Sequence, residues 1–223
     1  MLPSSPEDWS DKKGWEDYWR KILVEDEWLI SKRLLQDTGY FDSVDHFKSE
    51  GIKSILFLGC GISQAPKFFA FRGLQATGLD ISETAINFAV NYVFEYEKFY
   101  QWFNSNTFKV NKQVWLEFCS ISKKVSYECG SILDPNVAKE TFDLVIATKM
   151  LQGYCREQSK IREVLECIDQ RLRCNGKLLI FTINAPSARE MIDNQLTAMG
   201  YNKIMQLSDS KSGKSFLHML ASA

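Results

Sequence analysis

The sequence predicts an α/β fold with a doubly wound, mostly parallel sheet of seven strands. Apolar, strand-like segments alternate with amphipathic, helix-like segments over residues 51–223, which is the pattern of repeated βα units. A turn-rich stretch, residues 208–213, alone separates the last two strand-like segments. We therefore expect the sheet to end in an antiparallel C-terminal hairpin.

The first βα unit begins with a buried strand and a turn between two glycines. Ile55–Leu58 are apolar without alternation, as in a parallel strand that is buried on both faces. Gly59 and Gly61 flank Cys60 where the chain must turn sharply and let a ligand approach the backbone. We call residues 59–61 the glycine turn.

A helix and a second strand complete this unit. The helix is expected over residues 66–72, where Gly73 can end it, and the strand over residues 76–79. Asp80 follows this strand directly. An acid at that place can accept hydrogen bonds from both hydroxyls of a ribose, so the unit predicts a pocket for an adenosine-containing cofactor.

Residues 1–50 predict a helical extension in front of the main domain. Aromatic and apolar residues recur at helical spacing over residues 15–23, and a second amphipathic segment follows at residues 28–35. Four of the six tryptophans lie within the first 28 residues. The helices either pack on the domain or form an aromatic lid over the cofactor, and the concentration of large, stiff indole rings favours the lid.

An aromatic-rich insertion is expected at about residues 95–122. Ser82 is a plausible N-cap for a helix from Thr84 to about Tyr100, and residues 101–122 look less regular. The insertion forms either a satellite core or dimer face, or the wall of an apolar acceptor pocket. The remaining elements are expected to be a short helix at 43–50, strands at 125–129, 142–147, 177–182, 201–207 and 215–221, a helix at 157–172, and a helix at 187–199 capped by Ser187.

Composition excludes several classes of function. A net charge of -1 gives no general attraction to nucleic acid or to anionic membranes, and no apolar run is long enough to span a bilayer. The six cysteines lack C-x-x-C spacing, which indicates reduced thiols of a cytoplasmic protein and no zinc site. With only His46 and His218 present, histidine-rich metal catalysis and a Ser-His-Asp triad are disfavoured.

The glycine turn itself argues against a phosphate ligand. A dinucleotide fingerprint needs a third glycine, but none occurs among residues 62–66, and no basic residue lies in the turn. A P-loop Lys-Ser/Thr pair is also missing after the glycines.

At these residues the chain resembles the class I S-adenosylmethionine-dependent methyltransferases. The resemblance covers nearly all of residues 50–223 and rests on four stretches in order, at residues 55–61, 78–82, 142–145 and 176–179. It implies a Rossmann-like methyltransferase fold and S-adenosylmethionine as the cofactor. Phe57 departs from the pattern, because many members carry there an acid that orients the methionine amino group.

Within this class the chain is similar to the thiopurine S-methyltransferase-like branch. The shared features are a Trp-x-x-x-Trp helix at residues 15–19, the turn at 58–61, a Phe-Phe-Ala-Phe-Arg-Gly segment at 68–73 and Ser-Ile-Leu-Asp at 131–134. The resemblance implies that Trp15 and Trp19 close over the cofactor, Asp80 binds its ribose, and Ser131 and Ile132 flank its adenine. The implied cofactor-binding residues are Trp15, Trp19, Leu58, Gly59, Cys60, Gly61, Asp80, Ile81, Ser131, Ile132 and Thr148.

Lys149 falls where that branch has an arginine near the sulfonium and the acceptor. It is therefore a candidate for positioning the reactants, although a solvated loop lysine fits the sequence equally well. Cys60 fits a small buried residue better than a nucleophile.

Methyl transfer from a sulfonium needs mainly alignment and desolvation of the acceptor. A thiol is partly ionised near neutral pH, so the lack of an obvious histidine base suits S-methylation. We therefore expect a methyltransferase for a small, apolar or aromatic acceptor, methylated at sulfur. The alternatives are a protein side-chain N-methyltransferase and a non-catalytic, cofactor-binding partner subunit.

Overall fold

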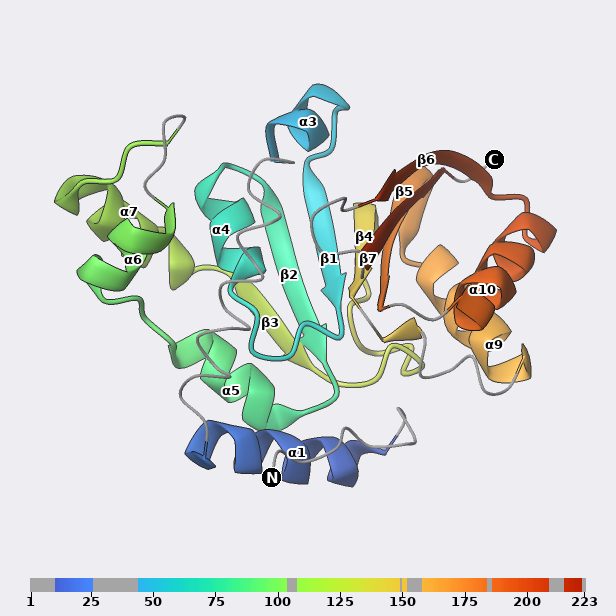
Figure 1. The fold of residues 1–223 in the computed structure, drawn as a ribbon, viewed down its shortest axis with the longest axis horizontal. Coiled ribbons are helices and arrows are strands. Elements are labelled where there is room, and N and C mark those ends of the chain that lie inside the picture. The colour runs from blue at the N-terminus through green and yellow to red at the C-terminus, as the bar shows by residue number, and fades with distance from the viewer. Residues whose placement is uncertain are drawn as a thin grey trace.

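The computed structural model describes residues 11–25, 44–103, 108–148, 150–151, 158–183, 186–208 and 215–221. One sheet has the strand order β3-β2-β1-β4-β5-β7-β6 (Figure 1). Its strands are β1 (Ser54–Leu58), β2 (Gln75–Asp80), β3 (Ser126–Cys129), β4 (Phe142–Thr148), β5 (Leu172–Ile183), β6 (Asn202–Ser208) and β7 (Ser215–Ala221). The five strands from β3 to β5 run parallel, whereas β7 is antiparallel to β5 and β6. The expected α/β fold with a mostly parallel sheet is confirmed, and five of the strands form its parallel part.

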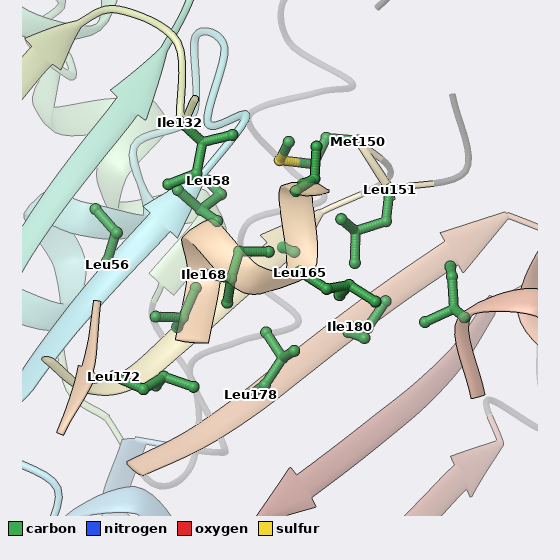
Figure 2. Close-up of a cluster of buried hydrophobic side chains, with 14 of the residues drawn as sticks. Leu56, Leu58, Ile132, Met150, Leu151, Leu165, Ile168, Leu172, Leu178 and Ile180 are labelled. Atoms are coloured by element: carbon green, nitrogen blue, oxygen red, sulfur yellow. The ribbon is translucent and has the colours of Figure 1, made fainter. Parts of the chain in front are cut away.

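Helices cover both faces of this sheet. They are α1 (Lys12–Glu25), α3 (Val44–Ser49), α4 (Ala65–Phe71), α5 (Glu83–Asn91), α6 (Tyr96–Phe103), α7 (Lys112–Ser122), α9 (Gln158–Asp169) and α10 (Pro186–Ala198). Because successive side chains of a strand point to opposite faces, β1 contributes to two cores. Leu56 and Leu58 pack with α9 and α10 (Figure 2), and Ile55 and Phe57 pack with α3 and α4.

The expected helix from Thr84 to about Tyr100 is wrong, because the chain leaves the helix between α5 and α6. Tertiary donors take the carbonyl groups that a continuous helix would use. The Lys67 ammonium donates to the carbonyls of Val90 at 3.1 Å and Tyr92 at 2.8 Å. The Trp115 indole N–H donates to the carbonyl of Phe94 at 2.8 Å.

The second half of the insertion is more regular than expected, because α7 is a helix. Its N-cap is Asn111, whose Oδ1 accepts a hydrogen bond from Val114 N at 2.9 Å. The aromatic rings of the insertion pack on one another and on α4: Phe99 and Phe118 lie 4.7 Å apart between centroids, and Phe68 stacks on Phe103 at 5.2 Å. These rings therefore extend the core on the α4 face of the sheet.

Two further boundaries differ from expectation. The strand expected over residues 177–182 is longer in the structure, because β5 runs from Leu172 to Ile183 and includes Asn175, which has a φ of 62°. The last helix begins at Pro186, so Ser187 lies inside it and does not cap it; proline suits a first helical position because its φ is preset. The amphipathic segment expected at residues 28–35 lies outside the described residues.

Helix α1 lies beside α5, along the side of the sheet where the strands end (Figure 1). The carboxyl ends of β1 and β2 both lie on this side, because parallel strands run in the same direction. None of the helices in the described part of the chain is long and apolar enough to cross a membrane.

Candidate cofactor site

Asp80 connects the glycine turn to the start of α5. Its side chain lies at the end of β2 and is buried. One carboxylate oxygen, Oδ2, accepts a hydrogen bond from Gly61 N at 2.7 Å, and Oδ1 accepts one from Ser82 N at 2.9 Å. A single acid thus fixes both backbone segments that follow the ends of β1 and β2.

Burial raises the pKa of Asp80 from 3.8 to about 6. The nearby charge of Glu16 acts in the same direction, whereas the hydrogen bonds from Ser82 and Gly61 oppose it. The raised pKa means that the carboxylate is incompletely stabilised by its present partners. Further donors at these oxygens would stabilise the charged form.

The backbone of the glycine turn adopts a conformation that favours glycine. Gly59 has a φ of 62° and Gly61 a φ of 55°, which side chains of L-residues rarely allow. A Cβ atom at Gly61 would lie 2.7 Å from Cζ2 of Trp19, and one at Gly59 would lie 3.1 Å from Cβ of Met150. Helix α1 and the segment after β4 therefore both contact the turn.

Tyr127 of β3 binds the chain just after the glycine turn. Its ring crosses β2 at Gly78, where a Cβ atom would lie only 2.6 Å from the ring. The Tyr127 hydroxyl can then donate a hydrogen bond to the carbonyl of Ser63 at 3.1 Å. Cys60 is half-buried beside the same glycine, which agrees with a space-filling role.

Two residues of α1 attach this helix to the edge of the sheet. Trp19 is 4% exposed and lies against Gly61. Glu16, one turn earlier, accepts hydrogen bonds from the backbone N–H groups of Glu83 and Thr84. Trp15 is half-buried and packs edge-on against Tyr18, with ring centroids 5.4 Å apart.

Apolar side chains form a floor beside the glycine turn. We use "apolar floor" for Leu58, Ile132, Met150 and Leu151, which lie together where β1 and β4 end (Figure 2). Each of the four is at most 8% exposed. Ser131 precedes this group and uses its hydroxyl to accept a hydrogen bond from Leu133 N at 3.2 Å, which shapes the loop after β3.

The structure brings together most of the residues expected at the site. Leu58, the glycine turn, Asp80, Ile81, Ser131 and Ile132 all lie at or next to the ends of β1, β2 and β3. Phe57 instead packs edge-on against Phe69 in the core, so it offers nothing to a ligand. The side chain of Thr148 and the whole of Lys149 lie outside the described residues. Among the side chains that the structure describes, no group of three or more possible metal ligands occurs.

Sequence reasoning missed three contributors to this site. Glu16 could have been noticed from its position inside the Trp-x-x-x-Trp segment. Met150 and Tyr127 had no local signal, because their contacts are with Gly59 and Gly78 in distant parts of the chain.

The donor set fits an adenosine-type cofactor. A buried carboxylate at the end of β2 offers lone pairs to ribose hydroxyls, the apolar floor suits a purine face, and the glycine turn leaves its backbone approachable. The described turn has no basic residue, which agrees with a ligand that lacks phosphate. The Trp19 ring would border such a ligand on the side of α1.

The family model described as "Methyltransferase domain" matches residues 56–180, which is more than half of the chain. No curated protein matches the sequence. The N-methyltransferase NodS from Bradyrhizobium japonicum WM9, solved with S-adenosyl-L-homocysteine, is 15% identical; the match covers 93% of this chain and 97% of that chain, with a TM-score of 0.59.

Two other solved structures have the same fold. The magnesium protoporphyrin IX methyltransferase ChlM from Synechocystis PCC 6803, with bound S-adenosylmethionine, is 13% identical over 100% of both chains, with a TM-score of 0.60. The glycopeptide N-methyltransferase MtfA, in complex with S-adenosylmethionine, is 12% identical over 82% of this chain and 94% of that chain, with a TM-score of 0.53.

The chain belongs to the family of methyltransferase domains. It is an enzyme, a methyltransferase that depends on S-adenosylmethionine.

Proposed function

We propose that this methyltransferase acts on a small, apolar or aromatic acceptor and methylates it at a thiol sulfur. The observation that carries the proposal is the aromatic cover of the site: the buried ring of Trp19, on α1, lies against Gly61, which is itself buried. An aromatic and apolar enclosure suits an uncharged, flat acceptor better than a peptide.

We propose the residue roles that the resemblance to the methyltransferases implies. Asp80 accepts hydrogen bonds from the ribose hydroxyls, the glycine turn carries the methionine end, and Ser131 and Ile132 border the adenine. Trp15 and Trp19 belong to a lid formed by the N-terminal extension, as in the thiopurine S-methyltransferase-like branch. The β6–β7 pair, which completes the sheet beyond β5, supports the seven-stranded form of the methyltransferase fold.

The choice of sulfur rests on the small number of histidines, since the sequence contains only His46 and His218. His46 lies on α3, at the amino end of β1 and thus away from the glycine turn. A thiol has a lower pKa than an alcohol or a protonated amine. It therefore depends less on a general base of the protein to become a nucleophile. Lys149 follows β4 and is proposed to position the reactants.

An acceptor panel tests this proposal. The purified protein, supplied with S-adenosylmethionine carrying a labelled methyl group, is incubated with aromatic thiols, amines and phenols of matched size. We expect the thiols to be methylated fastest. Preferential methylation of amines, as the names of NodS and MtfA would suggest, would overturn the proposal for sulfur. Label that appears on lysate proteins would favour a protein substrate.

The affinity for S-adenosylmethionine should depend on pH through Asp80. Ribose hydroxyls donate to the charged carboxylate, so a proton on Asp80 competes with the cofactor. Because the pKa of Asp80 is about 6, Kd should rise about tenfold per pH unit below pH 6. Calorimetric titrations from pH 5 to 8 measure this slope, and in Asp80→Asn it should vanish.

The cofactor-free protein should show the opposite dependence. Because burial raises the pKa of Asp80 above 3.8, the folded state binds this proton more tightly than the unfolded state. The contribution of Asp80 to stability is therefore present below pH 4 and is lost as the pH rises through 6. Unfolding midpoints measured without cofactor over this range, for the wild type and for Asp80→Asn, test the sign.

Removing the Tyr127 hydroxyl should loosen the glycine turn. In Tyr127→Phe the ring still fills the space above Gly78, but the hydrogen bond to the Ser63 carbonyl is lost. One such bond contributes about 1 kcal/mol, so we expect Kd for S-adenosylmethionine to rise about fivefold. An unchanged Kd would show that the turn does not need this support.

A further inference from the structure

We propose that Glu16 is a positioning residue of the cofactor site: by capping α5 it holds α1, and with it Trp19, over the glycine turn. This inference rests on the proposed role of the turn in cofactor binding. Glu16 itself need not contact the cofactor.

A residue of α1 accepts from two of the backbone N–H groups at the start of α5. A helix begins with backbone N–H groups that have no partner inside the helix. At α5, Ser82 accepts from Ala85 N at 3.2 Å, but the N–H groups of Glu83 and Thr84 donate to the Glu16 carboxylate. The negative charge also suits the positive end of the helix dipole.

The two contacts of α1 reach the two backbone segments that Asp80 binds. Glu16 and Trp19 are three residues apart and therefore share one face of the helix. Glu16 reaches α5, and Trp19 reaches Gly61. Asp80 binds the backbone of both these regions, at Ser82 and Gly61. Helix α1 is thus attached to both segments that the residue expected to hold the ribose also binds.

The pKa of the Glu16 carboxyl indicates that its hydrogen bonds are specific. Burial disfavours its charge, and Asp80 lies near enough for the two charges to interact. The hydrogen bonds from Thr84, Glu83 and Ser82 nevertheless leave the pKa of Glu16 below its usual value. The carboxylate is therefore held in place by the start of α5, and its loss would release α1 from that position.

Asp17 provides a matched control on the same helix. It is adjacent in sequence, its side chain is 58% exposed, and it pairs with Lys13 on the outer surface at 2.9 Å. Removing it changes the charge by the same amount as removing Glu16. It does not alter a contact between α1 and α5.

The test compares Glu16→Ala, Glu16→Gln and Asp17→Ala with the wild type. Calorimetry gives Kd for S-adenosylmethionine, stopped-flow tryptophan fluorescence gives its dissociation rate, and limited trypsin digestion reports the exposure of Arg20 and Lys21 on α1. For Glu16→Ala we expect about a tenfold weaker Kd, mainly from faster dissociation, and faster cleavage in α1. Glu16→Gln, which keeps one acceptor oxygen, should lie between, and Asp17→Ala should match the wild type.

Two results have distinct meanings. If the wild type does not bind S-adenosylmethionine, the proposed cofactor role of the turn is wrong. If the wild type binds but Glu16→Ala shows the same Kd, dissociation rate and cleavage as Asp17→Ala, only the role of Glu16 is overturned. Circular dichroism on each variant establishes that the sheet is intact.

Discussion

Replacing Asp80 with alanine should abolish measurable binding of S-adenosylmethionine. The carboxylate would accept two ribose hydroxyls, and each hydrogen bond to a charged group contributes about 1.5–3 kcal/mol. Losing both corresponds to at least about a 100-fold rise in Kd. The substitution also frees the N–H groups of Gly61 and Ser82, which now donate to Asp80, so the glycine turn loses its attachment to α5.

This effect can be separated from unfolding. Removing Asp80 deletes two hydrogen bonds but also removes a buried charge, and these contributions to stability oppose each other. Unfolding midpoints without cofactor should therefore change far less than affinity. Asp45→Ala, which removes an exposed carboxylate paired with Arg72, should leave calorimetric Kd unchanged. An Asp80→Ala variant that binds within twofold of the wild type would rule out the ribose contact.

The parts of this site that sequence predicted are those whose signals are local. The glycine turn and Asp80 belong to one strand–turn–helix–strand unit. The residues that determine its backbone conformation and its charge all lie within 30 positions of one another in the sequence. The start of α5 was likewise visible, because Ser82 accepts the hydrogen bond from Ala85 N that an N-cap predicts.

The errors came from contacts between distant parts of the chain. Nothing near Val93 predicts that a helix must stop there, because the competing donors are Lys67 on α4 and Trp115 on α7. Lys67 is 2% exposed, and burial lowers its pKa to about 8; sequence rules place lysine on the surface. A tertiary hydrogen bond thus overrode local helix propensity.

Tertiary contact also explains why the aromatic insertion could not be interpreted from sequence. A run of phenylalanines suits a pocket wall and a core equally well. In the structure Phe94 and Phe99 are at most 1% exposed and pack with the rings of α4 and α7. Helices α6 and α7 lie beyond α4, away from α1 (Figure 1), and their rings extend the core on that side of the sheet.

Replacing Gly61 with alanine should destabilise the protein and weaken cofactor binding together. The φ of 55° costs an L-residue about 1–2 kcal/mol. The new Cβ would lie 2.7 Å from Trp19 Cζ2, and overpacking of this kind costs about 1–3 kcal/mol more. We expect the free energy of unfolding from urea titrations to fall by about 2–5 kcal/mol. Kd for S-adenosylmethionine should rise as well, because Trp19 must move from the turn.

A matched glycine separates backbone strain from the contact with Trp19. Gly51 has a φ of 77°, and a Cβ atom there would meet no atom within 4 Å, so Gly51→Ala should cost only the strain and leave Kd unchanged. In the double variant Trp19→Ala/Gly61→Ala the clash disappears, and the two destabilisations should fall short of additivity by at least about 1 kcal/mol. If the changes in the free energy of unfolding are strictly additive, or are equal for Gly51→Ala and Gly61→Ala, then Trp19 does not restrict the space at Gly61. The lid would then have to close over the cofactor through other residues of α1.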